Sequence, residues 1–156
     1  MLACFVTDIR PRSSQGGRRG RLESYKQRLA EDFHNQGTIF SEAPFSLPLY
    51  SKVIYIHLRD TDLDVDNMSK PIIDAFNGIM YTDDKIIKHM VCSKISFNEF
   101  EFYNLNLKGL PAEVIDRFDT YLEEKSEHIL YYEIGVFSES MVFIGRQDGE
   151  TYAEVD

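Results

Sequence analysis

The amino-acid sequence predicts an α+β domain, a two-layer sandwich in which helices cover a mixed β-sheet. Two patterns point to this class: short apolar segments with alternating side chains, typical of strands, and longer segments whose apolar residues recur at helical spacing. Size is the third observation, because 156 residues, 43% of them hydrophobic, can bury a core without disulfides or metals and are not disordered. No internal repeat is visible in the sequence.

Strand-like and helix-like segments follow one another along the chain. We expect a first strand over 2–9, then a basic loop rich in Ser and Gly. Apolar spacing predicts an amphipathic helix over 22–34, a second over 69–80 and a third opened by Pro111. Pro71 is expected in the first turn of the second helix, where a missing N–H costs little. Further strands are predicted over 50–59, 86–97 and 100–107, with a hairpin over 129–137 and 141–145 and a last short strand after Asp148-Gly149.

Charge is distributed unevenly along the chain, whose net charge is −9. Residues 1–109 carry 14 basic and 14 acidic side chains, whereas residues 110–156 carry 3 basic and 12 acidic ones. We therefore predict a core over 1–109 and an acidic C-terminal extension over 110–156, a helix plus a β-hairpin packed on the same domain. Residues 10–28 hold seven basic side chains against one acid, which indicates either a phosphate-binding patch or a solvated charged surface.

The sequence carries no membrane or secretion signal that we recognise. No run of about 18 apolar residues is present. The apolar start of the chain includes Asp8 and lacks a basic segment, unlike a signal peptide. Cys4 and Cys92 are isolated, which argues against a structural zinc site or a disulfide framework. We expect a soluble protein of a reducing cytoplasm with no membrane partner.

Aspartates alternate with other residues just after the strand predicted over 50–59. They are Asp60, Asp62, Asp64 and Asp66. In an extended chain all four would point to one face, about 6.6 Å apart at neighbouring positions. Like charges on one strand face repel, so such a row is either tolerated in water or used to bind a cation. Hard divalent ions such as Mg²⁺ prefer these oxygen ligands.

The next helix adds a lysine and further acids. Lys70 and Asp74 are four residues apart and share one helix face. Asp84 follows at the start of the next strand, so the three elements could gather carboxylates of Asp64, Asp66, Asp74 and Asp84 beside Lys70. That arrangement suits phosphodiester hydrolysis with a metal ion.

The acidic segment has two other interpretations. A calcium loop of the EF-hand type fails, because neither a start at Asp60 nor one at Asp62 gives Gly and Glu at the required positions. An acidic surface loop followed by a capped helix, with Lys70 paired to Asp66 and Asp74, is the non-functional alternative.

The segment 64–84 resembles the RusA family of Holliday junction resolvases, the crossover junction endodeoxyribonucleases. The family pattern D-x-D-N-x-x-K-x-x-x-D-A, followed by a hydrophobic residue and later by a D-D pair, is matched by Asp64-Val65-Asp66-Asn67, Lys70, Asp74-Ala75-Phe76 and Asp83-Asp84. A looser similarity includes the first strand, Arg10-Pro11-Arg12 and the strand that carries Lys94. The resemblance covers about residues 1–97.

The resemblance implies a RusA-like homodimer that binds four-way DNA junctions and cuts two strands symmetrically in DNA recombination and repair, using Mg²⁺ or, as a substitute, Mn²⁺. By position, Asp64, Asp66 and Asp84 match the metal-binding aspartates, and Lys70 matches the catalytic lysine. Asp74, Asp83 and Asn67 are expected to support these groups without binding the metal themselves. The expected DNA contacts are Arg10, Arg12, Arg18, Arg19, Arg21 and Lys94. The protein would be bacterial or phage-encoded.

Two alternatives from outside this assignment stay open. One is a catalytically silent DNA-binding or protein-interaction module with the same fold, which the acidic C-terminal segment favours. The other is a metal-dependent nuclease for other branched or flap DNA. The charge of −9 opposes DNA binding unless the acidic part faces away from the DNA or is covered by a partner.

Overall fold

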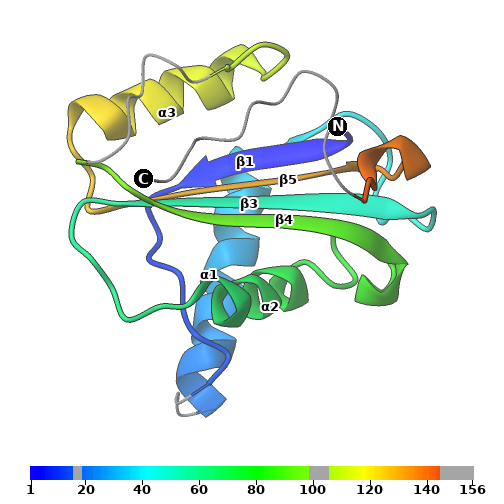
Figure 1. The fold of residues 1–156 in the computed structure, drawn as a ribbon, viewed down its shortest axis with the longest axis horizontal. Helices are drawn as coiled ribbons and strands as arrows, with labels where there is room; N and C mark the ends of the chain where they lie inside the picture. The colour runs from blue at the N-terminus through cyan, green and yellow to red at the C-terminus, as the bar shows by residue number, and fades with distance from the viewer. Residues whose placement is uncertain (16–18, 99–105, 145–156) are drawn as a thin grey trace.

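Within residues 1–15, 19–98 and 106–144, which the computed structural model describes, five strands form one open, mixed β-sheet (Figure 1). The strands are β1 (Ala3–Thr7), β2 (Thr38–Ile39), β3 (Leu49–His57), β4 (Ile87–Ser96) and β5 (His128–Val136). Their order across the sheet is β2-β1-β5-β3-β4. Strands β3 and β4 are parallel, and the other neighbours are antiparallel. The predicted α+β class with a mixed sheet is confirmed.

Helices cover both faces of this sheet. The α-helices of the described residues are α1 (Arg19–Gln36), α2 (Val65–Ala75) and α3 (Ala112–Glu123), and η1 (Asp84–Ile86) and η3 (Glu139–Met141) are short 3-10 turns. Helices α1 and α2 lie against one face and α3 lies against the other (Figure 1). Helix α2 connects the parallel strands β3 and β4. No helix in the described ranges is long and apolar enough to span a membrane.

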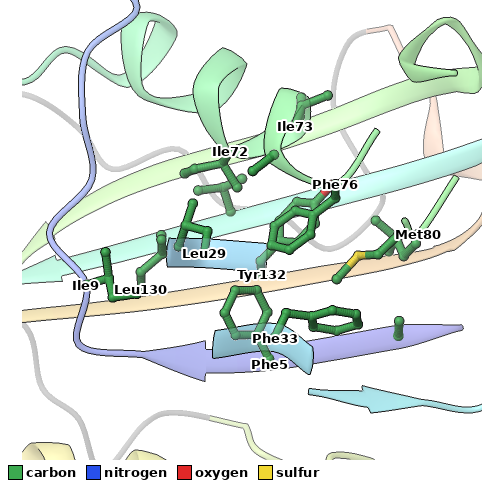
Figure 2. Close-up of a cluster of buried hydrophobic side chains, with 14 of the residues drawn as sticks. Phe5, Ile9, Leu29, Phe33, Ile72, Ile73, Phe76, Met80, Leu130 and Tyr132 are labelled. Atoms are coloured by element: carbon green, nitrogen blue, oxygen red, sulfur yellow. The ribbon is translucent and has the colours of Figure 1, made fainter. Parts of the chain in front are cut away.

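The main core lies between the sheet and the pair α1 and α2. Aromatic rings of Phe5, Phe33 and Phe76 meet edge to face, with centroids 5.4 to 5.5 Å apart. Tyr132 of the central strand β5 stacks on Phe76 at 5.1 Å. Figure 2 shows these rings between the two helices and the sheet. Such aromatic pairs stabilise a core beyond the area that they bury, so this cluster holds α2 in place on the sheet.

Several predicted elements are confirmed with shifted ends. The first helix is longer than the predicted 22–34, and α3 does begin after Pro111. In β3, Val53 and Tyr55 face α1 and α2 while Ile56 faces α3, as the alternation of side chains predicted. The strand predicted over 100–107 falls mostly on residues outside the described ranges, and the one after Asp148 falls wholly outside them.

The chain from Asp60 to Asp66 is not extended throughout, so the condition under which the four carboxylates would share one face is not met. Strand β3 ends at His57, and α2 begins at Val65, so Asp66 lies in the first turn of a helix. Met68 and Ile72, four residues apart and fully buried, extend the apolar stripe of the helix towards its start. The predicted helix over 69–80 therefore begins four residues earlier and ends at Ala75.

The hairpin predicted over 129–137 and 141–145 is also wrong. Its first strand, β5, instead lies between β1 and β3 and pairs with both. Residues 139–141 form only a 3-10 turn. Seven consecutive residues of β5 are buried, a pattern typical of a central strand covered on both faces. A central strand needs a partner on each side, and a local hairpin would supply only one.

We predict that Phe76→Ala lowers the free energy of unfolding by about 3 to 5 kcal/mol, because it removes the ring that contacts Phe5, Phe33 and Tyr132. Urea denaturation of the purified protein measures this. The matched control is Phe40→Ala, since Phe40 is 52% exposed and its loss should change stability by about 0.5 kcal/mol or less. Equal effects of the two changes would contradict the packing described here.

Candidate active site

Lys70 lies at the centre of the predicted cluster. Its ammonium nitrogen is 2.6 Å from a carboxylate oxygen of Asp74 and 2.5 Å from one of Asp84. Asp74 is one turn further along α2, whereas Asp84 begins η1 in front of β4. The Lys70 side chain is 55% exposed and those of its two partners 27% each. The Lys70 ammonium group therefore connects α2 to the start of β4 and is still accessible at the surface.

Hydrogen bonds to Asp74 and then to Asp84 raise the pKa of the Lys70 ammonium above its usual value. Lys70 is therefore charged at neutral pH. Asp74 has a second basic neighbour, Lys26 of α1, at 3.6 Å. Sequence reasoning missed this contact, because Lys26 and Asp74 lie on separate helices and no periodicity links them.

Asp64 and Asp66 lie at the start of α2 and take no part in these ion pairs. Asp64 is the N-cap residue, but its side chain makes no capping hydrogen bond. Both carboxylates are exposed and have no ion pair or hydrogen bond among the described residues. Asp66 precedes Lys70 by four residues and so lies on the same face of α2.

The metal ligands expected from the sequence are not gathered tightly here. In the described part of the chain, no three His, Cys, Asp or Glu side chains are close enough together to hold a metal ion. The structure thus brings Lys70, Asp74 and Asp84 together, and Asp64, Asp66 and Asp84 do not form such a group of three. The donor chemistry nevertheless fits a hard cation, since Asp64 and Asp66 offer exposed carboxylate oxygens that have no partner within the described ranges.

The side chains of Asp83 and Asn67 both accept hydrogen bonds from neighbouring parts of the protein. A carboxylate oxygen of Asp83 accepts the backbone N–H of Lys85 at 2.9 Å, which caps η1. This hydrogen bond is the main reason why the pKa of Asp83 lies below its usual value. The side-chain oxygen of Asn67 accepts the Ser14 hydroxyl at 3.4 Å.

Pro71 lies inside α2, and its predicted place in the first turn is wrong. It is the seventh residue of the helix. Because proline has no N–H, the carbonyl of Asn67, four residues earlier, loses its helical partner. The backbone N–H of Ser14 donates to this carbonyl at 2.9 Å. The carbonyl freed by the proline still has a hydrogen-bond donor. It attaches to α2 the loop between β1 and α1, which carries Arg10 and Arg12 and which we call the arginine-rich loop.

The expected DNA contacts fall into two groups. Arg10, Arg12 and Arg21 line a cavity of about 250 Å³ that also reaches Asp62 and Leu63, just before α2. Arg19 is the first residue of α1, and Arg18 lies outside the described ranges. The three lining arginines therefore lie next to the segment that carries Asp64 and Asp66.

Lys94 has a different environment. Its ammonium donates to a carboxylate oxygen of Asp60 at 3.0 Å and to the carbonyl of Thr61 at 2.5 Å. The hydrogen bond from Lys94 is the main cause of a lowered pKa at Asp60. Lys94 thus fixes the loop between β3 and α2 from the edge strand β4.

Comparison with known proteins finds a family model that matches this chain. Residues 13–102, more than half of the chain, match the family model described as endodeoxyribonuclease RusA. The matched range includes α1, β3, α2 and β4 and ends before α3 and the central strand β5. No curated protein matches the chain.

We predict that Pro71→Ala weakens the attachment of the arginine-rich loop. The new backbone N–H at this position would compete with Ser14 for the Asn67 carbonyl, so the Ser14 amide should exchange its hydrogen about five to ten times faster. The higher helix propensity of alanine opposes the packing lost at the buried Pro71, so the diagnostic measurement is exchange at Ser14 and not stability. Amide hydrogen exchange followed by NMR measures the effect. Pro111→Ala is the control, and unchanged exchange at Ser14 in Pro71→Ala would refute the proposed link.

Proposed function

Because the chain belongs to the RusA family of endodeoxyribonucleases, we propose that it is a metal-dependent endonuclease that resolves Holliday junctions by paired symmetric cleavage of phosphodiester bonds in DNA recombination and repair. The observation that carries this proposal is Lys70, held by Asp74 and Asp84 on the exposed face of the helix that also presents Asp66. Asp64 and Asp66, at the start of the same helix, are exposed and lack partners among the described residues, which a purely structural ion pair would not require.

We assign a divalent cation, Mg²⁺ with Mn²⁺ as a substitute, to Asp64, Asp66 and Asp84. Their carboxylate oxygens are the ligands that such ions prefer. When bound, the ion would polarise the phosphate and lower the pKa of an attacking water. Asp74 and Asp83 do not bind it in this proposal: Asp74 holds Lys70, and Asp83 caps the turn from which Asp84 projects.

Lys70 is the proposed catalytic cation. It is positively charged at neutral pH, and its side chain is 55% exposed, so a phosphate oxygen can reach it. A fixed positive charge stabilises negative charge that builds on the phosphate in the transition state. Asp74 and, behind it, Lys26 restrict the position of Lys70 and so orient it towards the substrate.

The distribution of charge supports DNA binding on the face of α1 and α2. Arg10, Arg12, Arg18, Arg19, Arg21 and Lys94 are the proposed contacts with the DNA backbone. The acidic residues of α3 lie on the opposite face of the sheet (Figure 1); they are Glu113, Asp116, Asp119 and Glu123. The acidic charge carried by α3 therefore does not oppose a DNA strand at α2.

We further propose a homodimer in the cytoplasm of a bacterium or of a phage-infected cell. Two subunits related by a two-fold axis would present two sites to a symmetric junction. In this proposal residues 1–109 form the nuclease core and 110–156 an acidic extension packed on the same domain, which also supplies the central strand β5. Binding of junctions without any product at any metal concentration would instead favour a silent DNA-binding module. Preference for flap or three-way DNA would favour a broader nuclease.

We predict that Asp66→Asn lowers the rate of cleavage of a synthetic four-way junction by about a hundredfold or more, while binding of the junction is largely kept. Cleavage by the wild type should require added Mg²⁺ and stop with a chelator. Asp119→Asn, on the far side of the sheet, is the matched control and should cut normally. Full activity of Asp66→Asn would refute the assignment.

Simultaneous replacement of Arg18, Arg19 and Arg21 by alanine should weaken junction binding and lower its salt dependence. Each lost phosphate contact reduces the slope of log affinity against log salt by about 0.9. Binding titrations over a range of NaCl concentrations measure this. Replacement of Lys108 and Lys125, which flank α3, should leave the slope unchanged. An unaltered slope in the arginine variant would assign DNA contact to other residues.

A further inference from the structure

A second basic pocket lies on α1, next to the cavity described above. It has a volume of about 360 Å³, and we call it the arginine pocket. Its charged and aromatic lining consists of Arg10, Arg12, Arg21, Arg28 and Tyr25. Arg28 and Tyr25 are not among the DNA contacts expected from the sequence. The two residues are three apart on α1 and so share a helix face.

The positive charge of the arginine pocket is not neutralised by the protein. None of its four guanidinium groups makes an ion pair or a hydrogen bond with another described residue, and all four side chains are exposed. Glu23, two residues from Arg21, pairs with Lys26 instead at 3.3 Å. Asp62 lines only the neighbouring cavity. Four like charges around one pocket are stabilised by an anion, and guanidinium groups match a phosphate with paired hydrogen bonds.

Tyr25 provides an independent observation. Its side chain is buried, with 4% of its surface exposed, and its hydroxyl has no hydrogen-bond partner of normal geometry among the described residues, although the Arg12 backbone lies beside it. A buried hydroxyl without a partner costs about 1 to 3 kcal/mol. The hydroxyl is covered, so a ligand oxygen would reach it only after a neighbouring group shifts.

We propose that the arginine pocket binds one phosphate of the DNA backbone that is not itself cut. This inference rests on the proposed nuclease function for the identity of its ligand. The pocket shares no lining residue with the hollow beside Lys70 and Asp84, so the two bind different phosphates. Arg28 and Tyr25 act as positioning residues, because they hold the strand and do not touch the reacting atoms.

The position of the pocket explains how it would act. It shares Arg10, Arg12 and Arg21 with the cavity that ends at Asp62 and Leu63. The loop that carries two of these arginines is attached to α2 through Ser14 and Asn67. A phosphate held in the pocket is therefore fixed relative to the start of α2, and this contact would set which neighbouring phosphate reaches Lys70.

The test uses four-way junctions that carry one neutral methylphosphonate at successive backbone positions, with binding measured in a chelator so that no cleavage occurs. For the wild type, neutralising the phosphate in the pocket should weaken binding about tenfold or more, since a charged hydrogen-bond partner is lost. Arg28→Ala should weaken binding of the unmodified junction by a similar factor. A methylphosphonate at the position of the pocket phosphate should then cause no further loss of affinity in this variant. Lys108→Ala is the matched control and should behave like the wild type at every position.

Two further arms distinguish the remaining explanations. Tyr25→Phe removes only the hydroxyl and should give a smaller loss that is likewise absent at the same position. Titration with inorganic phosphate tests a site for a small free anion: phosphate binding that Arg28→Ala removes, without any effect of a single methylphosphonate, would overturn the assignment to DNA.

The outcomes separate this inference from the proposed function. Two results for Arg28→Ala would overturn the arginine pocket while leaving cleavage untouched. One is wild-type affinity for the unmodified junction. The other is a loss of binding that adds to the loss caused by a methylphosphonate at every position. A wild type that shows the position-specific effect but cuts with no metal would overturn the metal-dependent nuclease and leave the pocket standing. A wild type that binds no DNA would overturn both.

Discussion

Burial of one face of α2 against the sheet determines where the polar groups of the candidate site lie. Met68, Ile72 and Phe76 are fully buried, and Phe76 stacks on the central strand. The spacing of 3.6 residues per turn then forces Asp66, Lys70 and Asp74 onto the outer face. Burial of apolar surface, which is worth about 25 cal/mol per Å², thus keeps these three charged side chains in a row on the outer face.

Two groups of charged residues lie on opposite sides of the sheet. On the side of α1 and α2, Lys70 neutralises part of the charge of Asp74 and Asp84, while Asp64 and Asp66 remain unpaired among the described residues. The guanidinium groups of the arginine pocket lie along the same side. The acids of α3 are separated from both by the sheet (Figure 1). A chain with a net charge of −9 can therefore still offer a local surface that attracts phosphate.

Much of the fold was predicted from the periodicity of apolar residues, and each wrong prediction has a physical cause. Alternating or helical apolar spacing predicted α1, β3 and α3, because each buries a face that the pattern displays. The alternation of aspartates was misleading, since period two describes a strand only when apolar residues share it. Residues 60–64 lie in the connection between β3 and α2, and only Asp66 lies inside the helix, whose buried face includes Met68 and Ile72. Of the site, the contact of Lys70 with Asp74 follows from a spacing of four, and that with Asp84 from the order of elements. The contact with Lys26 joins two helices and had no signal.

The sequence by itself determined which side chains are available and which face of each helix or strand they occupy, because those properties depend on neighbours within a few residues. Only the tertiary structure decided which faces meet. It placed β5 between β1 and β3, joined Lys26 to Asp74, and used the carbonyl freed by Pro71 to hold Ser14. These contacts join residues far apart in the chain, and the free energy of packing the whole sheet selects them. No local pattern of residues records that selection.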